Sequence, residues 1–91
     1  MVRAEQQWED QARYDLETAH AMLRSGRFLY VLFCSQQSIE KLLKALIVKR
    51  TGEFPPRIHN LIRLADVAKL DLDPHHQQLL GDLSNYYIQT R

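Results

Sequence analysis

Hydrophobic residues recur along the first part of the chain with the spacing of an α-helix. They are separated by four, four, three and four residues, which places them on one helical face: Trp8, Ala12, Leu16, Ala19 and Leu23. The spacing predicts a helix over residues 3–24, and Gly26 is expected to end it in the left-handed conformation. Because the connection is very short, the next helix should fold back antiparallel to the first.

The second predicted helix, residues 27–51, is apolar nearly all round. Its inward stripe is expected to contain Phe28, Leu32, Ile39, Leu43 and Leu46. A second apolar strip contains Leu29, Phe33, Leu42 and Ile47. A helix with two apolar faces is buried on more than one side. Since the rest of a 91-residue chain can hardly cover both, the functional form is predicted to be a dimer rather than a monomer. A final helix of the same domain, missing from these 91 residues, is the alternative cover.

Gly52 and the pair Pro55-Pro56 should end the second helix and force an extended connection. A third helix is then expected over residues 59–70, with four residues facing inward: Leu61, Ile62, Ala65 and Ala68.

Asp73 and Pro74 have the order of a helix N-cap followed by proline at the first helical position. They predict a fourth helix from Pro74 to about Asn85, which buries Leu79, Leu80 and Leu83. No segment alternates with period two. Residues 1–91 are therefore predicted to form one all-α domain, an up-and-down antiparallel bundle of four helices.

Polar residues interrupt the second helix where it should be most deeply buried. Gln36 falls on the inward stripe, and Gln37, Glu40 and Lys44 follow on an adjacent strip. Glu40 precedes Lys44 by four residues, the favourable order for an ion pair. Because buried polar groups are costly unless they are bonded, these four residues are predicted to form a mostly buried network. Such a network can fix helix register or dimer pairing, or it can bind a ligand.

The net charge is only +1, but it is unevenly distributed. The first 20 residues carry five acidic and two basic residues, whereas residues 41–63 carry six basic residues and one acidic residue. This basic middle can attract phosphate, or it can be neutralised by the acidic first helix or by a partner. A phosphate site would require four side chains to approach one another around the second connection: Lys41, Lys44, Arg57 and His59.

The single cysteine, Cys34, excludes an internal disulfide and suits a reducing compartment. The N-terminus MVRAEQQWED has no apolar core of a secretory signal. The longest apolar run, Phe28 to Cys34, is far shorter than the ~20 residues of a membrane-spanning helix. A cytoplasmic location without membrane association is therefore expected.

Few motifs point to catalysis. The adjacent His75 and His76 would point about 100° apart on a helix, which is unsuitable for one metal ion. There is no glycine-rich phosphate loop, and neither a metal nor a cofactor is expected. Trp8 and Tyr86-Tyr87 could stack on a base. The hydroxyl of Tyr87 is instead expected to complete the polar network.

The strings QQSIEKLLKALIVKRTGEFPPRIHNL and LSNYYIQTR, in this order, resemble the HEPN domain family. Its usual strings are close to QQAAEKALKAL, PP-x-THDL and YYIPTRYP, and WEDQARYDLETAHAMLRSGRFLYVLFCSQQ fits its first two helices. The resemblance implies a helical bundle, commonly dimeric, often encoded beside a minimal nucleotidyltransferase. The pair forms a toxin–antitoxin system or a two-part transferase. Nucleotide binding and, in some branches, metal-independent RNA cleavage are the implied activities.

The family's recurrent polar residues fall, by position, on Gln37, Glu40, Lys41, Lys44, His59, Tyr87 and Arg91. Arg57 joins this set because it lies beside His59 in the basic middle. His59 either contacts phosphate or holds the connecting loop.

The chain also departs from the family pattern. Ile58 and Asn60 flank His59 where the family has a hydroxyl residue and an aspartate, and Gln89 replaces a proline. The family also continues past the position of Arg91 into another long helix, where its RNase branch carries an Arg-x4–6-His motif. Arg13 and His20 match that spacing only on the first helix, as about one pair should by chance. An RNase toxin with its motif on a later helix and a purely structural adaptor remain the alternatives.

Overall fold

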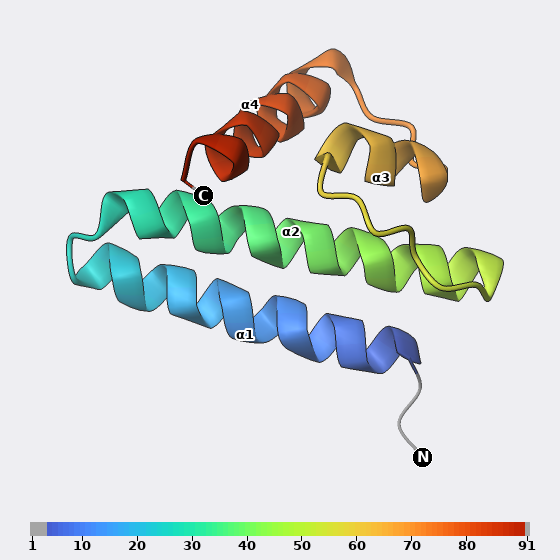
Figure 1. The fold of residues 1–91 in the computed structure, drawn as a ribbon, viewed down its shortest axis with the longest axis horizontal. Helices are drawn as coiled ribbons and strands as arrows, with labels where there is room; N and C mark the ends of the chain where they lie inside the picture. The colour runs from blue at the N-terminus through green and yellow to red at the C-terminus, as the bar shows by residue number, and fades with distance from the viewer. Residues whose placement is uncertain (1–3, 91) are drawn as a thin grey trace.

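The computed structural model describes the backbone of residues 4–90 and the side chains of residues 4–85, and this part of the chain forms four α-helices (Figure 1). They are α1 (Ala4–Arg24), α2 (Phe28–Thr51), α3 (Leu61–Val67) and α4 (Pro74–Thr90). The predicted all-α fold with four helices is confirmed.

The helices α1 and α2 form a long antiparallel hairpin (Figure 1). Gly26 has a φ of 74°, in the left-handed region that glycine tolerates best. Its N–H donates to the Leu23 carbonyl at 3.1 Å, and the Arg27 N–H donates to the Met22 carbonyl at 2.8 Å. These two bonds form a Schellman cap, which satisfies the last carbonyls of α1 and turns the chain sharply into α2.

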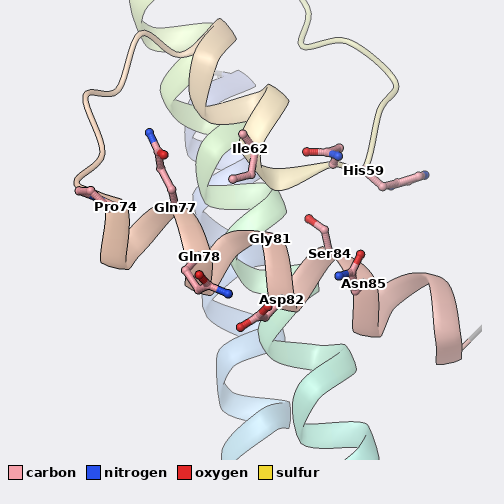
Figure 2. Close-up of a pocket in the computed structure, with 10 residues that line it drawn as sticks. His59, Ile62, Pro74, Gln77, Gln78, Gly81, Asp82, Ser84 and Asn85 are labelled. Carbon is pink, nitrogen blue, oxygen red and sulfur yellow. The ribbon is translucent and has the colours of Figure 1, made fainter.

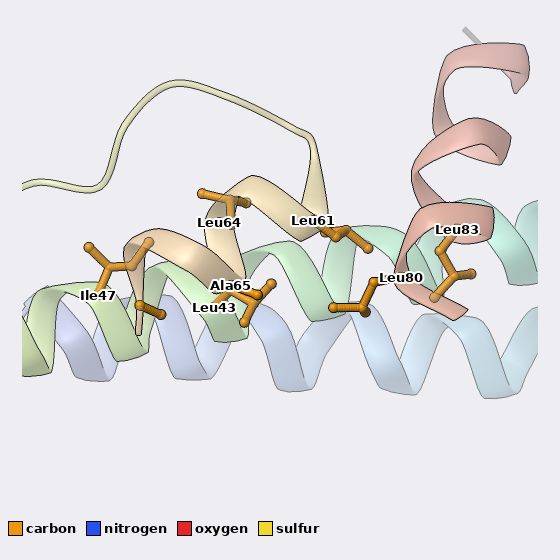
Figure 3. Packing of buried hydrophobic residues seen from close by; sticks show 8 residues of the cluster. Leu43, Ile47, Leu61, Leu64, Ala65, Leu80 and Leu83 are labelled. Atoms are coloured by element: carbon orange, nitrogen blue, oxygen red, sulfur yellow. The ribbon is translucent and has the colours of Figure 1, made fainter. Parts of the chain in front are cut away.

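α2 is the central helix of the fold. α1 packs against it on one side, while α3 and α4 pack on another, and α1 contacts only α2 among the described helices (Figure 1). Most of the apolar core lies between α2, α3 and α4, where it consists of Leu43, Ile47, Leu61, Leu64, Ala65, Ala68, Leu80 and Leu83 (Figure 3). On the α1 side, small residues are buried instead, namely Ala12 and Ala19.

Several apolar residues differ from the prediction in their exposure. Ile47, placed on the second strip of α2, is in the core with 2% exposure. Phe28, placed on the inward stripe, is 65% exposed because it begins α2 at the hairpin turn. Leu79 is 47% exposed, since the buried face of α4 centres on Leu80 and Ser84, and Leu79 lies about 100° around the helix from Leu80.

α3 is shorter than predicted at both ends. Asn60 is its N-cap, because the Asn60 side-chain oxygen accepts the Arg63 N–H at 3.1 Å. Lys69 ends the segment with a φ of 60°, which is incompatible with a continuing helix. Leu64, which was not among the residues predicted to face inward, is fully buried. α4 is longer than predicted and continues to Thr90.

Candidate functional site

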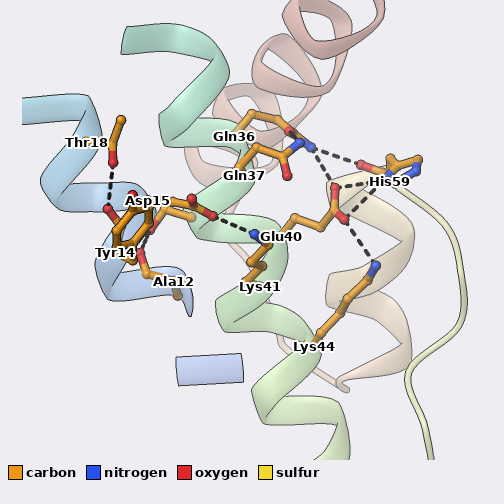
Figure 4. A network of polar contacts seen from close by, with 11 residues as sticks. Ala12, Tyr14, Asp15, Thr18, Gln36, Gln37, Glu40, Lys41, Lys44 and His59 are labelled. Carbon is orange, nitrogen blue, oxygen red and sulfur yellow. Dashed lines mark hydrogen bonds and ion pairs between the residues drawn. The ribbon is translucent and has the colours of Figure 1, made fainter. Parts of the chain in front are cut away.

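Glu40 is the centre of a polar network on the side of α2 that faces the α2–α3 connection (Figure 4). Its carboxylate accepts hydrogen bonds from Gln36 Nε2 at 3.1 Å and from Lys44 Nζ at 3.1 Å. His59 Nδ1 lies 3.0 Å from both carboxylate oxygens. Gln37 Nε2 donates to Gln36 Oε1 at 3.0 Å. The network therefore joins two consecutive turns of α2 to a residue that is distant in sequence.

Local helix geometry assembles most of this network. Gln36, Glu40 and Lys44 are spaced four residues apart, so their side chains lie on one face of α2. The loop that ends at the Asn60 cap brings His59 to the same face, and Gln36 Nε2 also contacts the His59 carbonyl at 3.4 Å. Gln36 is fully buried, and Glu40 and Lys44 are nearly so. The prediction of a mostly buried network is confirmed, with Gln37 half-buried.

The surroundings of Glu40 favour its charged form. Burial alone would raise the pKa of Glu40, since a low-dielectric environment penalises charge. Three hydrogen bonds from neighbouring side chains, led by that of His59, lower this pKa, and so does the positive charge of Lys44. Together these effects outweigh burial. The pKa of Glu40 is consequently lower than the ordinary glutamate value. A buried, ionised carboxylate thus lies behind the His59 imidazole and orients it.

Lys41 belongs to a different contact. Its ammonium lies 2.9 Å from the Asp15 carboxylate of α1, on the opposite side from His59 (Figure 4). Lys41 follows Glu40 directly, so its side chain points about 100° away around α2. The acidic first helix therefore neutralises Lys41, and the structure does not bring Lys41 to the group formed by Lys44 and His59.

A hollow of about 510 Å³ opens next to the network, and we call it the Trp8 hollow. It is lined by Trp8, Lys44, Phe54, Pro55, Pro56 and Arg57. Lys44 connects the two features, since its Nζ bonds to Glu40 and also lies 5.5 Å from the centroid of the Trp8 ring. At that distance the ammonium makes a cation–π contact with the indole.

A second, larger hollow of about 730 Å³ lies between the start of α3 and α4 (Figure 2). His59 and Asn60 contribute from the loop before α3, and Gln78, Asp82 and Asn85 contribute from α4. The buried Ser84 in its wall is satisfied, because its Oγ accepts the Leu61 N–H at 2.9 Å. This lining offers amide and carboxylate groups, with His59 the one basic residue among the lining residues described.

The HEPN domain model matches residues 5–91. The chain belongs to the HEPN domain family. No curated protein and no solved structure matches the chain significantly. The match confirms the resemblance found in the sequence, and it covers both long helices and the α2–α3 connection that positions His59.

In this HEPN domain, the predicted site residues separate into three groups. Glu40, Lys44 and His59 are in direct contact, and Gln37 reaches Glu40 through Gln36. Arg57 shares the Trp8 hollow with Lys44, whereas Lys41 pairs with α1. The Tyr87 side chain and Arg91 lie outside the described residues.

Sequence reasoning missed two participants of the site. Phe54 gave one usable signal, because it is a large apolar residue between Glu53 and the two prolines, where no helix is predicted to bury it. Ser84 gave another, because it occupies the helical position four residues after the buried Leu80. The direct contact between His59 and Glu40 had no local signal, since 19 residues separate them.

Neither a metal centre nor a membrane span stands out in the part of the HEPN domain that the structure describes. Within it, no three side chains of histidine, cysteine, aspartate or glutamate are grouped so that they could hold a metal ion. Within the same residues, no helix combines the length and apolar character needed to cross a membrane.

Proposed function

We propose that this HEPN domain is a nucleotide- or RNA-associated helical module of the cytoplasm. It acts as a homodimer together with a minimal nucleotidyltransferase, in a toxin–antitoxin pair or a two-part transferase. Membership of the HEPN family supports the general role. The observation that carries the proposal is the position of Lys44, which joins the Glu40–His59 network to the hollow that contains Arg57.

The cationic groups around the α2–α3 connection have different tasks. The Lys44 charge is neutralised largely by Glu40, since both side chains are more than nine-tenths buried and lie 3.1 Å apart. Lys44 therefore positions the neighbouring groups rather than attracting a ligand from solution. Arg57 is exposed, and the His59 side chain is 48% exposed. These two residues provide the surface that a phosphate would meet first.

Binding of labelled short single-stranded RNA and of labelled ATP, measured by fluorescence anisotropy at several salt concentrations, tests this proposal. Affinity should fall as salt increases, because phosphate contacts release counterions. Arg57→Ala should weaken RNA binding. It should also make the slope of the logarithm of the affinity against the logarithm of the salt concentration less steep by about 0.7, the value for one phosphate contact on a single strand.

Arg24→Ala is the matched control, since Arg24 is an exposed arginine at the far end of α1, about 24 Å along the helix from Trp8. It should leave both the affinity and the slope unchanged. Absence of binding to RNA and to ATP at low salt would contradict the nucleotide-associated role. The partner is tested separately, by co-purification with the product of a neighbouring nucleotidyltransferase gene.

A further inference from the structure

The Trp8 hollow combines aromatic surface with positive charge. Trp8 comes from the first turns of α1, and Phe54, Pro55, Pro56 and Arg57 come from the α2–α3 connection. Its volume of about 510 Å³ is within the range of sites for small ligands. Two segments that are distant in sequence thus form one concave surface.

Phe54 is an unusual residue in this surface, because its side chain is 92% exposed although it is large and apolar. The backbone that carries it is held firmly on both sides. The Gly52 N–H donates to the Val48 carbonyl at 2.8 Å, and the Glu53 N–H donates to Thr51 Oγ1 at 3.1 Å. On the other side, the two prolines restrict the backbone. Because the backbone is already restrained, only the two side-chain torsions of Phe54 have to be ordered when its ring contacts a ligand.

The charges around the hollow select the kind of ligand. The Lys44 ammonium already occupies the cation position at the Trp8 ring, and the Arg57 guanidinium lies in the same lining. A cationic ligand, such as a quaternary ammonium, would therefore have to displace Lys44 from the Trp8 ring, and it would be repelled by Arg57. A ligand that joins an uncharged flat ring to an anionic group fits both features, because the ring can stack on an aromatic face and the anion is attracted by Arg57.

We propose that the Trp8 hollow binds one unpaired nucleobase by stacking, with the attached phosphate at Arg57. This inference rests on the proposed nucleotide-associated role and assigns it a place and a mode of binding. The recognised unit is a base with its phosphate, supplied either by a free mononucleotide or by a nucleotide within single-stranded RNA.

Trp8 makes the test direct, because it is the only tryptophan in the chain. Its fluorescence therefore reports on this hollow without any substitution. Titration with AMP and with an eight-nucleotide oligoadenylate should quench the fluorescence saturably. Quenching by AMP identifies a free nucleotide as sufficient, whereas quenching by the oligonucleotide alone identifies a strand. Ribose 5-phosphate, which lacks the base, should bind at least ten-fold more weakly than AMP. If only the oligonucleotide binds, ribose 5-phosphate should bind at least ten-fold more weakly than the oligonucleotide.

Phe54→Ala removes one stacking surface and should weaken binding roughly five- to hundred-fold, whereas Phe54→Tyr should retain it. Because Phe54 is 92% exposed, neither change should alter the helical circular dichroism. Tyr30→Ala is the matched control, since Tyr30 is also an exposed aromatic residue, at 57%, but lies at the start of α2. It should leave binding unchanged.

Three results would overturn the inference, and they are distinguishable. Equal binding of AMP and ribose 5-phosphate would show that no base is recognised. Binding that is detected by anisotropy, but neither quenches Trp8 nor weakens in Phe54→Ala, would place the nucleotide elsewhere and leave the proposed function standing. Absence of binding to every nucleotide and RNA would reject the inference and the nucleotide-associated role together.

Discussion

At the scale of single residues, the Glu40 carboxylate shows how one buried charge can organise a site. Its side chain is only 5% exposed and receives donors from Gln36, Lys44 and His59. An isolated charge in such a place would cost several kcal/mol, so Glu40 can be buried in its charged form only because these partners bond to it. Two of them, Gln36 and Lys44, come from α2 itself and are placed by the helix, whereas His59 reaches the carboxylate only once the α2–α3 connection has folded back.

The lowered pKa of Glu40 predicts a specific loss of stability in acid. Below about pH 4.5 the unfolded chain binds a proton at this carboxyl, whereas the folded chain still holds it ionised. The contribution of Glu40 is thus fully present above that pH and is lost as the pH falls through the folded-state pKa. The slope from this one group is at most about 1.4 kcal/mol per pH unit.

Urea unfolding of the wild type and of Glu40→Gln between about pH 6 and pH 3 measures this contribution. We expect the variant to be less stable at neutral pH, because Lys44 loses its counter-charge, and to show a flatter dependence on pH in the acid range. Parallel pH profiles for the two proteins would mean that Glu40 has the same pKa in the folded and unfolded chains.

At the scale of the elements, side-chain caps mark where α3 and α4 begin, and the cap of α3 bears directly on the position of His59. The Asn60 side chain caps α3 and sits directly after His59, so the cap also fixes the loop that brings His59 to Glu40. Asp73 has the same role in α4, where its carboxylate accepts the His76 N–H at 2.8 Å. Capping thus links local sequence to the geometry of the network.

Asn60→Ala should destabilise the domain by about 1 kcal/mol, the usual loss when an N-cap side chain is removed. Asn60→Asp is the matched control, because aspartate keeps the acceptor and adds a charge that the helix N-terminus favours. Thermal or urea unfolding of the three proteins gives the comparison. Equal stability of Asn60→Ala and wild type would show that the cap contributes nothing to folding.

The predictions from the sequence succeeded where a feature depends on residues close in the chain. The helix ends at Gly26 and Gly52 and the register of Glu40 with Lys44 all follow from spacings of a few residues. The predictions were less reliable for the exposure of individual apolar side chains. The sequence pattern alone did not determine which apolar residues of α2 would be covered, because that depends on where α3 and α4 pack. The contact of His59 with Glu40 and the Trp8 hollow are tertiary features of the same kind.

At the scale of the whole molecule, the hairpin of α1 and α2 retains apolar surface on the side away from the core. Leu16 and Leu42 are 48% and 56% exposed, and they line a shallow groove between the two helices together with Ala12 and Ser38. Leu23, Phe28 and Leu29, near the turn of the hairpin, are more than half exposed as well. Exposed apolar residues gathered on one hairpin in this way typically mark an interaction surface.

The proposed homodimer would cover this surface with a second copy of the same hairpin, in a two-fold arrangement that places the groove of one copy against that of the other. Leu16→Glu/Leu42→Glu places charges in the groove and should convert the dimer to a monomer at micromolar concentration, as measured by light scattering coupled to gel filtration. Leu79→Glu is the matched control, because Leu79 is 47% exposed but lies on α4, outside the groove. It should leave the dimer intact. A wild-type protein that is monomeric under the same conditions would show that a second copy does not cover the hairpin.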